Sequence, residues 1–300
     1  MRPDERAEAR IINKNKILVV LSKIEDEHLI KHFCGTTIEI DKLASLELPD
    51  FSNKTVYLCD APLIYQAPRI IFVPTTGILW DALNQEVTSI FEEQAPLNHV
   101  LAQIYRNTSA TENQKQTKAK ISAHADKTKD MPSNGVMAFC TFYDGLEKLQ
   151  PLSADSFDYG YKNTSGLTRL QFRLKNKTGQ GTECTLLDEF TVTLYPGSVF
   201  FMPLSTNRLY THAIKPSMLD ADRLPTRLGY VVRCSSTQAV HVDGKTFLKQ
   251  QEKLINLEPP IAEGMSELRK LYSDENKQDG FIDYGEKFLF SMNKGDKTQH

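Results

Sequence analysis

Short hydrophobic segments with strand-like spacing dominate the sequence from residue 98 to about residue 235. In "LTRLQFRLK", Leu170, Phe172 and Leu174 alternate with polar or charged positions, which is the period of a half-buried β-strand. Similar segments follow one another, separated by Gly, Pro, Asn and Asp: "NHVLAQIY", "NGVMAFCTFY", "DEFTVTLY", "GSVFFMP", "LYTHAI" and "TRLGYVVRCS". Many short strands with turn residues between them predict a β-sandwich or barrel such as a jelly roll.

The regions on either side have a different pattern. The first hundred residues combine strand-like segments at 16–21, 54–60 and 69–74 with helical spacing at 25–33 and an amphipathic helix at 77–94. Residues from about 245 to 275 have the pattern of two helices separated by Pro259 and Pro260. We therefore expect an α+β fold with three parts: an N-terminal α/β extension (1–97), a double-stranded β-helix or jelly-roll core (98–245) with flanking helices, and a C-terminal helical tail (246–300).

Composition limits the classes of function. The chain has 300 residues and a formal net charge of −2, so no global excess of positive charge favours a nucleic-acid-binding protein. Its five cysteines are scattered without a Cys-x-x-Cys pair, which argues against a cysteine-based zinc site. With neither a signal peptide nor a run of about 18 apolar residues, we expect a cytoplasmic protein that does not cross a membrane.

His124 and Asp126 lie two positions apart in "KISAHADKTKD". In a strand such residues point to the same face, so one metal ion could contact both. A surface turn is the alternative for this short pattern alone. His212 lies among the strands, in "NRLYTHAIKP", and is the candidate for a third ligand. His99 directly precedes an apolar strand, and we expect a capping or loop residue there.

Two arginines follow His212 on one predicted strand. Arg227 and Arg233 share a strand face with Gly229 and Val231. A buried arginine is unfavourable unless a carboxylate or phosphate pairs with it. The pattern therefore indicates a buried dicarboxylate ligand; arginines paired with surface acids are the alternative.

In this order, His124-x-Asp126, His212 and Arg227-x5-Arg233 resemble the iron(II)/2-oxoglutarate oxygenases, specifically their AlkB-like branch. The resemblance covers about residues 98–235. It implies that the two histidines and the aspartate bind iron(II) and leave positions open for 2-oxoglutarate and O2. It assigns the far carboxylate of 2-oxoglutarate to Arg227, since a guanidinium binds a carboxylate bidentately.

Further residues follow from the same resemblance. The family's Asn-x-Tyr pair, which contacts 2-oxoglutarate, corresponds to Gln103-x-Tyr105, with Arg233 as a further contact. Residues about 60–78 lie where this branch has its substrate lid, before the helix at 77–94. Arg69 in that lid and Lys127 beside the metal ligands are the candidate substrate contacts. Five lysines surround His124, either as a soluble loop or as a basic rim for an acidic substrate: Lys115, Lys118, Lys120, Lys127 and Lys129.

The sequence also departs from the family pattern. The usual Arg-x-Asn-x-Thr-x-Arg becomes Arg227-Leu-Gly-Tyr-Val-Val-Arg233, which lacks the central Asn and Thr. The loop between Tyr105 and His124 is unusually long. Six strand residues span about 20 Å, so Arg233 can help at the metal only if its side chain folds back toward the metal end.

The sequence therefore predicts an iron(II)/2-oxoglutarate-dependent oxygenase that hydroxylates or oxidatively demethylates its substrate, with release of succinate and carbon dioxide. The near-neutral charge favours a small metabolite or a protein side chain as substrate. An AlkB-like demethylase of N-methylated bases in DNA or RNA is the alternative. A catalytically inactive jelly-roll binding protein is a second alternative, because a fold by itself does not give activity.

Overall fold

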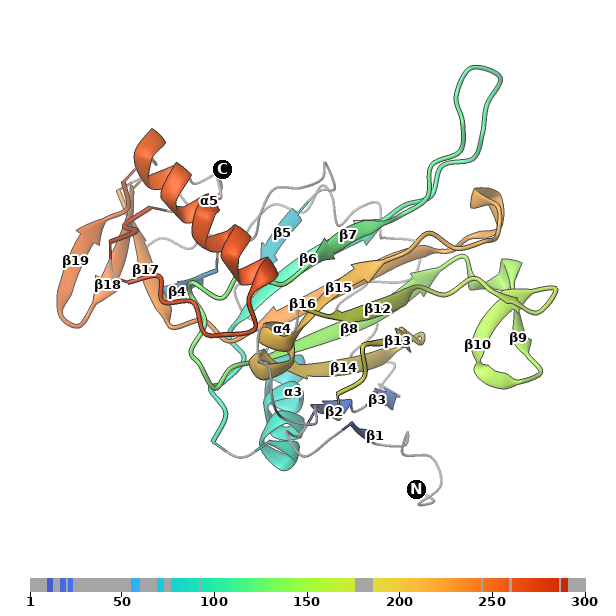
Figure 1. The fold of residues 1–300 in the computed structure, drawn as a ribbon, viewed down its shortest axis with the longest axis horizontal. Helices are drawn as coiled ribbons and strands as arrows, with labels where there is room; N and C mark the ends of the chain where they lie inside the picture. Colours follow the sequence, from blue (N-terminus) through green and yellow to red (C-terminus); the bar gives the residue numbers. More distant parts are fainter. Residues whose placement is uncertain are drawn as a thin grey trace.

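The structure is a computed structural model that describes residues 10–12, 17–19, 21–23, 55–59, 69–72, 77–91, 93–175, 186–243, 245–258, 261–285 and 287–290. It consists mostly of antiparallel β-sheets with few helices (Figure 1). The helix expected at 25–33 and most of the lid expected at about 60–78 lie outside the described residues.

The largest sheet has six strands in the described part of the chain. Their order is β3 (Leu21–Lys23), β14 (Ser198–Pro203), β8 (Val136–Asp144), β16 (Thr226–Arg233), β6 (His99–Tyr105) and β5 (Arg69–Phe72). All of these pairings are antiparallel. Strand β16 lies between β8 and β6, so both of its edges are paired and its side chains are among the most buried in the protein.

A four-stranded sheet lies beside it (Figure 1), with the order β13 (Glu189–Thr193), β12 (Arg169–Leu174), β15 (Tyr210–Ile214) and β7 (Ile121–His124). Along the chain, strands of the six-stranded sheet (β6, β8, β14, β16) are interspersed with strands of this sheet (β7, β12, β13, β15). The predicted alternation in β12 is confirmed, because Leu170 and Phe172 are buried whereas Arg169 and Arg173 are exposed. Lys175, predicted to point outward, is buried instead.

The main core lies between these two sheets. Phe139 and Phe200 of the larger sheet pack against Phe172 and Tyr210 of the smaller one, and the Phe172 and Phe200 ring centroids are 5.8 Å apart. Burial of aromatic side chains of this size contributes a large part of core stability. The contact joins β12 to β14 and therefore sets the space between the two sheets.

Helix α3 (Gly77–Ile90) covers the other face of the six-stranded sheet, within the range predicted for a helix. Leu83 and Val87 pack on alternate residues of β8, among them Val136 and Ala138. Because both faces of β8 are covered, its hydrophobic run is continuous, whereas β12 alternates. None of the helices in the part described is long and apolar enough to cross a bilayer.

The expected helical tail is only partly correct. Residues 245–256 form strands β18 (Lys245–Gln250) and β19 (Lys253–Asn256), which join β17 (Thr237–Val242) and β4 (Thr55–Leu58) in a separate four-stranded sheet. The segment is rich in Lys, Gln, Glu and Leu, which favour helices, but pairing with β17 overrides this weak preference. Helix α5 (Ala262–Lys277) follows, as expected.

Smaller elements complete the described chain. Strands β1 (Arg10–Ile12) and β2 (Ile17–Val19) form a pair, and β9 (Gln150–Leu152), β10 (Asp155–Tyr161) and β11 (Thr164–Ser165) form a three-stranded sheet. Helix α4 (Leu204–Leu209) joins β14 to β15, and 3-10 turns occur at η3 (Leu146–Lys148) and η4 (Ala221–Arg223).

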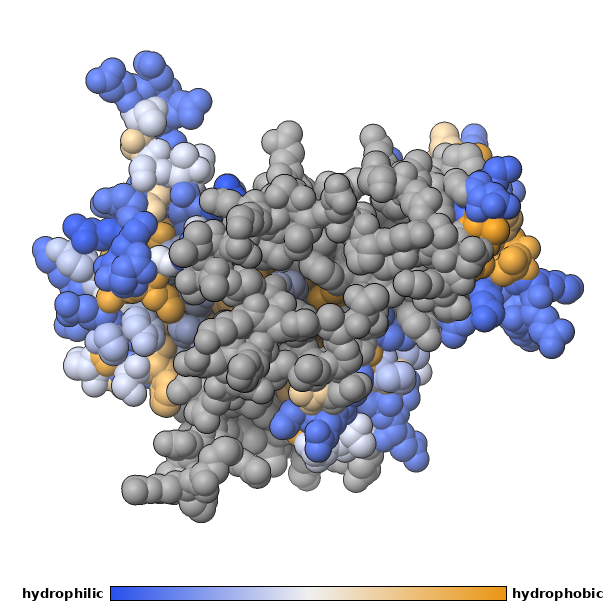
Figure 2. All heavy atoms as spheres, turned by 180° about the vertical axis from the view of Figure 1, so that it is seen from behind, coloured by the Kyte–Doolittle hydropathy of each residue, from blue (hydrophilic) through white to orange (hydrophobic). Residues whose placement is uncertain are grey.

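The long connection between β6 and β7 is a projecting hairpin (Figure 1), closed by bridges between Thr108 and Thr117 and between Thr111 and Gln114. Residues 108–117 are exposed, and the projection is hydrophilic (Figure 2). The long loop expected between Tyr105 and His124 is therefore an arm closed by two isolated β-bridges.

His99 is not the capping or loop residue that its position suggested. It is the first residue of β6, is 4% exposed and lies opposite Arg233. Burial, with a smaller effect from Arg233, lowers the pKa of His99 to about 3. Its imidazole is therefore neutral in the folded protein at pH 7.

This neutral histidine predicts a specific pH dependence of stability. A histidine whose folded pKa is lowered contributes its full stability above its unfolded pKa of about 6.5 and loses it as pH falls toward the folded value. Between pH 7.5 and 5.5, His99 is expected to account for a loss of about 1.4 kcal/mol. Urea unfolding of the wild type and of His99→Gln at both pH values should reveal this difference; an identical pH dependence would contradict it.

Candidate metal centre

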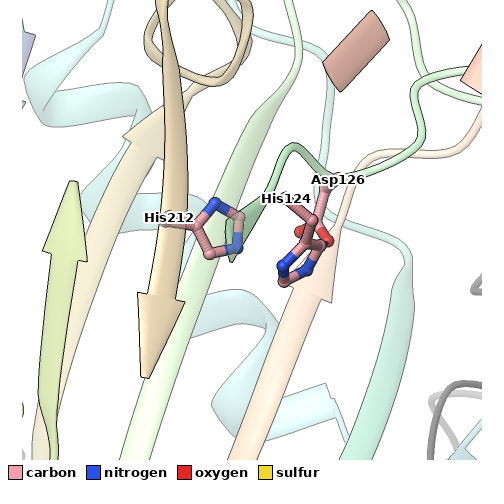
Figure 3. Close-up of side chains that lie close together, drawn as sticks. All are labelled: His124, Asp126 and His212. Atoms are coloured by element: carbon pink, nitrogen blue, oxygen red, sulfur yellow. The ribbon is translucent and has the colours of Figure 1, made fainter. Parts of the chain in front are cut away.

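Two histidines meet directly across neighbouring strands. His124 on β7 lies opposite His212 on β15 in the antiparallel register, and their ring centroids are 4.5 Å apart. Nitrogen atoms of both rings and a carboxylate oxygen of Asp126 all lie within 4.8 Å of one another. Figure 3 shows the three side chains directed toward a common point. The structure thus brings together the three predicted metal ligands from segments more than eighty residues apart.

One hydrogen bond orients the ring of His124. Its Nδ1 lies 2.9 Å from the backbone carbonyl oxygen of Ser122. A carbonyl oxygen only accepts, so Nδ1 carries the proton and donates. The other ring nitrogen, Nε2, faces the carboxylate and lies 3.6 Å from Asp126 Oδ1. A backbone carbonyl that accepts from the second ring nitrogen is the usual support of a metal-binding histidine.

Asp126 is buried next to a guanidinium. Arg233 Nη2 lies 3.2 Å from Asp126 Oδ2, and both side chains are less than 10% exposed. Burial acts to raise the pKa of Asp126, but Arg233 and the two histidines outweigh it and hold that pKa well below its usual range. The side chain is therefore a carboxylate at neutral pH. Arg233 was expected to act at the metal only if its side chain folds back toward the metal end of the strand. Its contact with Asp126 shows that the side chain does so.

His212 is a buried neutral base. It is 4% exposed, and burial, together with the charge of His124, lowers its pKa to about 3. Its Nδ1 is buried and has no hydrogen-bond partner among the described residues. Burying an imidazole nitrogen without a hydrogen-bond partner costs folding free energy. Coordination of the His212 ring to a metal ion would offset this cost. Two imidazoles and one carboxylate are the donor set of non-haem iron(II) sites, so these residues fit such an ion.

Arg227 lies in the same region of β16 but in a different environment. Its guanidinium carbon lies 3.9 Å from the centroid of the Tyr105 ring, opposite Tyr105 in the β16–β6 register. The Tyr105 hydroxyl donates to Gln103 Oε1 at 2.6 Å. Arg227 is 5% exposed, and its Nε has no hydrogen-bond partner in the described part of the structure. Of the two predicted arginines, Arg233 is thus paired with a carboxylate of the chain, and Arg227 stacks on an aromatic ring.

Gly229 provides the space for this stacking. A Cβ atom at position 229 would lie 2.8 Å from Arg227 Nη1 and 3.4 Å from Tyr105 Cε2. The first distance is shorter than real contacts of a Cβ atom. The absence of a side chain at Gly229 therefore leaves the space in which the guanidinium lies.

These residues line one cavity. Its volume is about 50 Å³, and its walls include the ligand set, Gln103, Tyr105, Arg227 and Arg233. A single water needs about 10–15 Å³ of such volume, so the cavity has room for a few water-sized groups. Phe139, Leu170 and Leu194 are among the apolar residues of its wall.

Neither candidate substrate residue is observed in the cavity wall. Arg69 is the first residue of β5, opposite Gln103 in the register with β6; its side chain is not among those described. Lys127 is buried, and its Nζ donates to the carbonyl of Tyr272 on α5 at 3.1 Å. The Lys127 amine is thus directed to α5, and the residue does not line the cavity.

The five lysines around His124 do not share one environment. Lys127 contacts α5, Lys129 Nζ lies 2.8 Å from Asp130 Oδ1, and Lys118 Nζ donates to the carbonyl of Ser217. Lys115 and Lys120 are exposed on the arm between β6 and β7. The predicted basic rim is therefore reduced to the side chains of the arm.

The structure adds residues that no motif indicated. Asn207 of α4 and Asn276 of α5 form hydrogen bonds with the backbone of Asp126 and Ala125. Glu275 and Lys175 lie in the same network. Asparagines and lysines at these positions have no recognisable spacing relative to His124, so no signal in the sequence could have identified them.

Comparison with known proteins adds no family assignment. No protein-family model matches the sequence, and no curated protein matches it significantly.

Proposed function

We propose that the two principal sheets form a double-stranded β-helix, the jelly roll of the AlkB-like oxygenases. The chain order supports this. Strands β6, β8, β14 and β16 belong to one sheet, and β7, β12, β13 and β15 to the other. A chain that repeatedly crosses between two antiparallel sheets is what a rolled-up Greek key produces. In this arrangement His124 follows the first crossing, and His212 and Arg227 lie on the last two strands.

We further propose that the protein is an iron(II)/2-oxoglutarate-dependent oxygenase. His124, Asp126 and His212 would hold the metal. Arg227, which is buried and has no carboxylate partner among the described residues, would bind 2-oxoglutarate. Arg227 is the observation that carries the proposal. A buried guanidinium without an acid partner is unfavourable, and a dicarboxylate ligand in the cavity it lines would supply that partner. Tyr105, with its hydroxyl on Gln103, holds the guanidinium by its ring face.

When bound, iron(II) and 2-oxoglutarate with O2 supply the oxidation of a substrate C–H bond and release succinate and carbon dioxide. The chain's own residues would orient the metal ligands and 2-oxoglutarate, and they would exclude water from the site. His124 donates from Nδ1 to the Ser122 carbonyl, which would leave Nε2 as the nitrogen that binds the metal. Arg233 keeps Asp126 ionised and fixes one carboxylate oxygen. The apolar side chains of Phe139, Leu170 and Leu194 line the cavity and would limit the access of bulk water.

The proposed substrate is a small metabolite or a protein side chain. The net charge of −2 and the split environment of the five lysines support this class. The second candidate, an N-methylated nucleobase, is favoured by the exposed basic residues of the arm, Arg106, Lys115 and Lys120. Binding of single-stranded DNA or RNA that weakens steeply with salt would indicate the nucleobase. Mass spectrometry after incubation with methylated oligonucleotides and with a metabolite extract would identify the product.

Succinate formation tests the activity. Protein reconstituted anaerobically with iron(II) and then given 2-oxoglutarate and oxygen is expected to release succinate. His124→Ala is expected to lower this rate by more than about 100-fold, because loss of a ligand exceeds the 10–100-fold effects of residues behind the ligands. Ser122→Ala is the control, since its side chain is exposed and its carbonyl remains. Equal rates for His124→Ala and the wild type would contradict the proposal; failure to bind iron(II) would favour the inactive binding protein.

A further inference from the structure

The backbone that carries Asp126 is not held by a β-sheet. Strand β7 ends at His124, and residues 125–128 have no strand partner. Ala125 and Asp126 are nevertheless buried. Buried N–H and C=O groups must find other hydrogen-bond partners. The same-face rule that places i and i+2 together in a strand therefore does not orient Asp126 here.

Helix α4 supplies the partners of Asp126 itself. Asn207 Oδ1 accepts from the Asp126 N–H at 2.8 Å, and Asn207 Nδ2 donates to the Asp126 carbonyl at 2.9 Å. Asn207 is 1% exposed. It lies five residues before His212 on the segment that leads into β15. One side chain thus links the backbone of the carboxylate ligand to the element that carries the second histidine.

Helix α5 holds the residues on either side. Asn276 Oδ1 accepts from the Ala125 N–H at 2.6 Å, and the Glu275 carboxylate accepts from the Thr128 N–H at 3.2 Å and from its hydroxyl. Lys175 Nζ donates to the carbonyls of Asn207 at 2.9 Å and of Glu275 at 2.7 Å. The hydrogen bonds form a closed ring that joins α4, α5 and the ligand segment.

We propose that Asn207 and Asn276 are positioning residues of the metal centre, which hold the ligand segment so that the Asp126 carboxylate faces His124 and His212. The inference rests on the proposed metal site. A metal centre needs its ligands fixed by residues behind them, and these two asparagines occupy the hydrogen-bonding groups of Ala125 and Asp126. Helix α5, which follows the oxygenase core in the sequence, is thereby part of the site.

Cobalt(II) binding to the metal-free protein tests the proposal, followed by visible absorption. Asn207→Ala is expected to raise the Kd for Co(II) by about 10–100-fold. Asn84→Ala is a matched control, because Asn84 of α3 makes the same two kinds of backbone hydrogen bond, with Leu97. Both variants lose a side chain that binds backbone, so both should lower the melting temperature, but only Asn207→Ala should weaken Co(II) binding. Equal Co(II) affinity of folded Asn207→Ala and wild type would overturn the proposal.

A second pair of variants keeps the test decisive if Asn207→Ala does not fold. Asn276 is only partly buried and makes a single bond to the ligand segment. Asn276→Ala is expected to weaken Co(II) binding about tenfold, and Asn276→Asp, which keeps the acceptor oxygen, to restore most of it. Unchanged affinity of Asn276→Ala would overturn the role of α5. Absence of Co(II) binding in the wild type would instead overturn the proposed metal centre, so the two failures are distinguishable.

Discussion

Asp126→Ala is expected to destabilise the metal-free protein by about 3–5 kcal/mol and to abolish metal binding. The reason is the ion pair with Arg233, whose charged atoms are 3.2 Å apart and almost fully buried. Truncating one member of such a pair leaves the other charge buried without compensation. Urea unfolding of the metal-free variant would measure the first effect, and metal titration the second.

Two further variants separate the electrostatic cause from general damage. Asp126→Ala combined with Arg233→Met should recover most of the stability, because no unpaired charge remains, but should not recover metal binding. Glu189→Ala breaks the pair of Glu189 with Arg173, which has the same 3.2 Å distance but is exposed, and should cost less than about 1 kcal/mol. Equal losses for the buried and the exposed pair would contradict this account.

Arg227→Met is expected to raise the KM for 2-oxoglutarate by roughly 30-fold to several thousand-fold. Loss of one partner of a buried charge pair costs about 2–5 kcal/mol of binding, and each 1.4 kcal/mol is tenfold. The unfolding free energy of the ligand-free protein should change by less than about 1 kcal/mol, because no described acid pairs with Arg227 there. Steady-state succinate formation at varied 2-oxoglutarate gives KM. A large loss of stability with unchanged KM would assign Arg227 a structural role.

Gly229→Ala should reproduce this effect without removing the charge. Its Cβ would displace Arg227 Nη1, the mobile end of a flexible side chain, from its place over Tyr105. We therefore expect an increased KM for 2-oxoglutarate with a small change in stability. Gly280→Ala is the control, since a Cβ there has no neighbour within 4 Å. An unchanged KM for Gly229→Ala would mean that the position of Arg227 over Tyr105 is unimportant for binding.

The strands and helices were predictable where burial follows one face of one element. The period-2 pattern of β12 and the amphipathic spacing of α3 report such one-sided burial, and both elements are present. The pattern did not predict β18 and β19, whose residues favour helices. Their strand form depends on β17, which offers an edge for pairing. Intrinsic preference is weaker than a row of interstrand hydrogen bonds.

The candidate site divides in the same way. The residue types His124, Asp126 and His212 were identifiable from the sequence, and the structure brings them together. The environment of Lys127 could not be identified from the sequence. Its amine is buried because it donates to the Tyr272 carbonyl on α5, 145 positions away in the chain. Likewise, the alternation along β12 would place Lys175 on the solvent-facing side. In the structure its amine instead donates to backbone carbonyls of α4 and α5.

The sequence by itself determined which chemistry the chain can offer: two imidazoles, one carboxylate and two arginines on strand-forming segments. Only the tertiary structure decided how these groups divide their tasks. It paired Arg233 with Asp126 and placed Arg227 on the ring of Tyr105 with no acid partner in the described part of the chain. It held the backbone of Asp126 through Asn207 and that of Ala125 through Asn276 rather than through a strand partner. The physical reason is that periodicity reports which face of an element is buried, whereas the partner of a buried charge or backbone group comes from distant segments brought close by sheet pairing and helix packing.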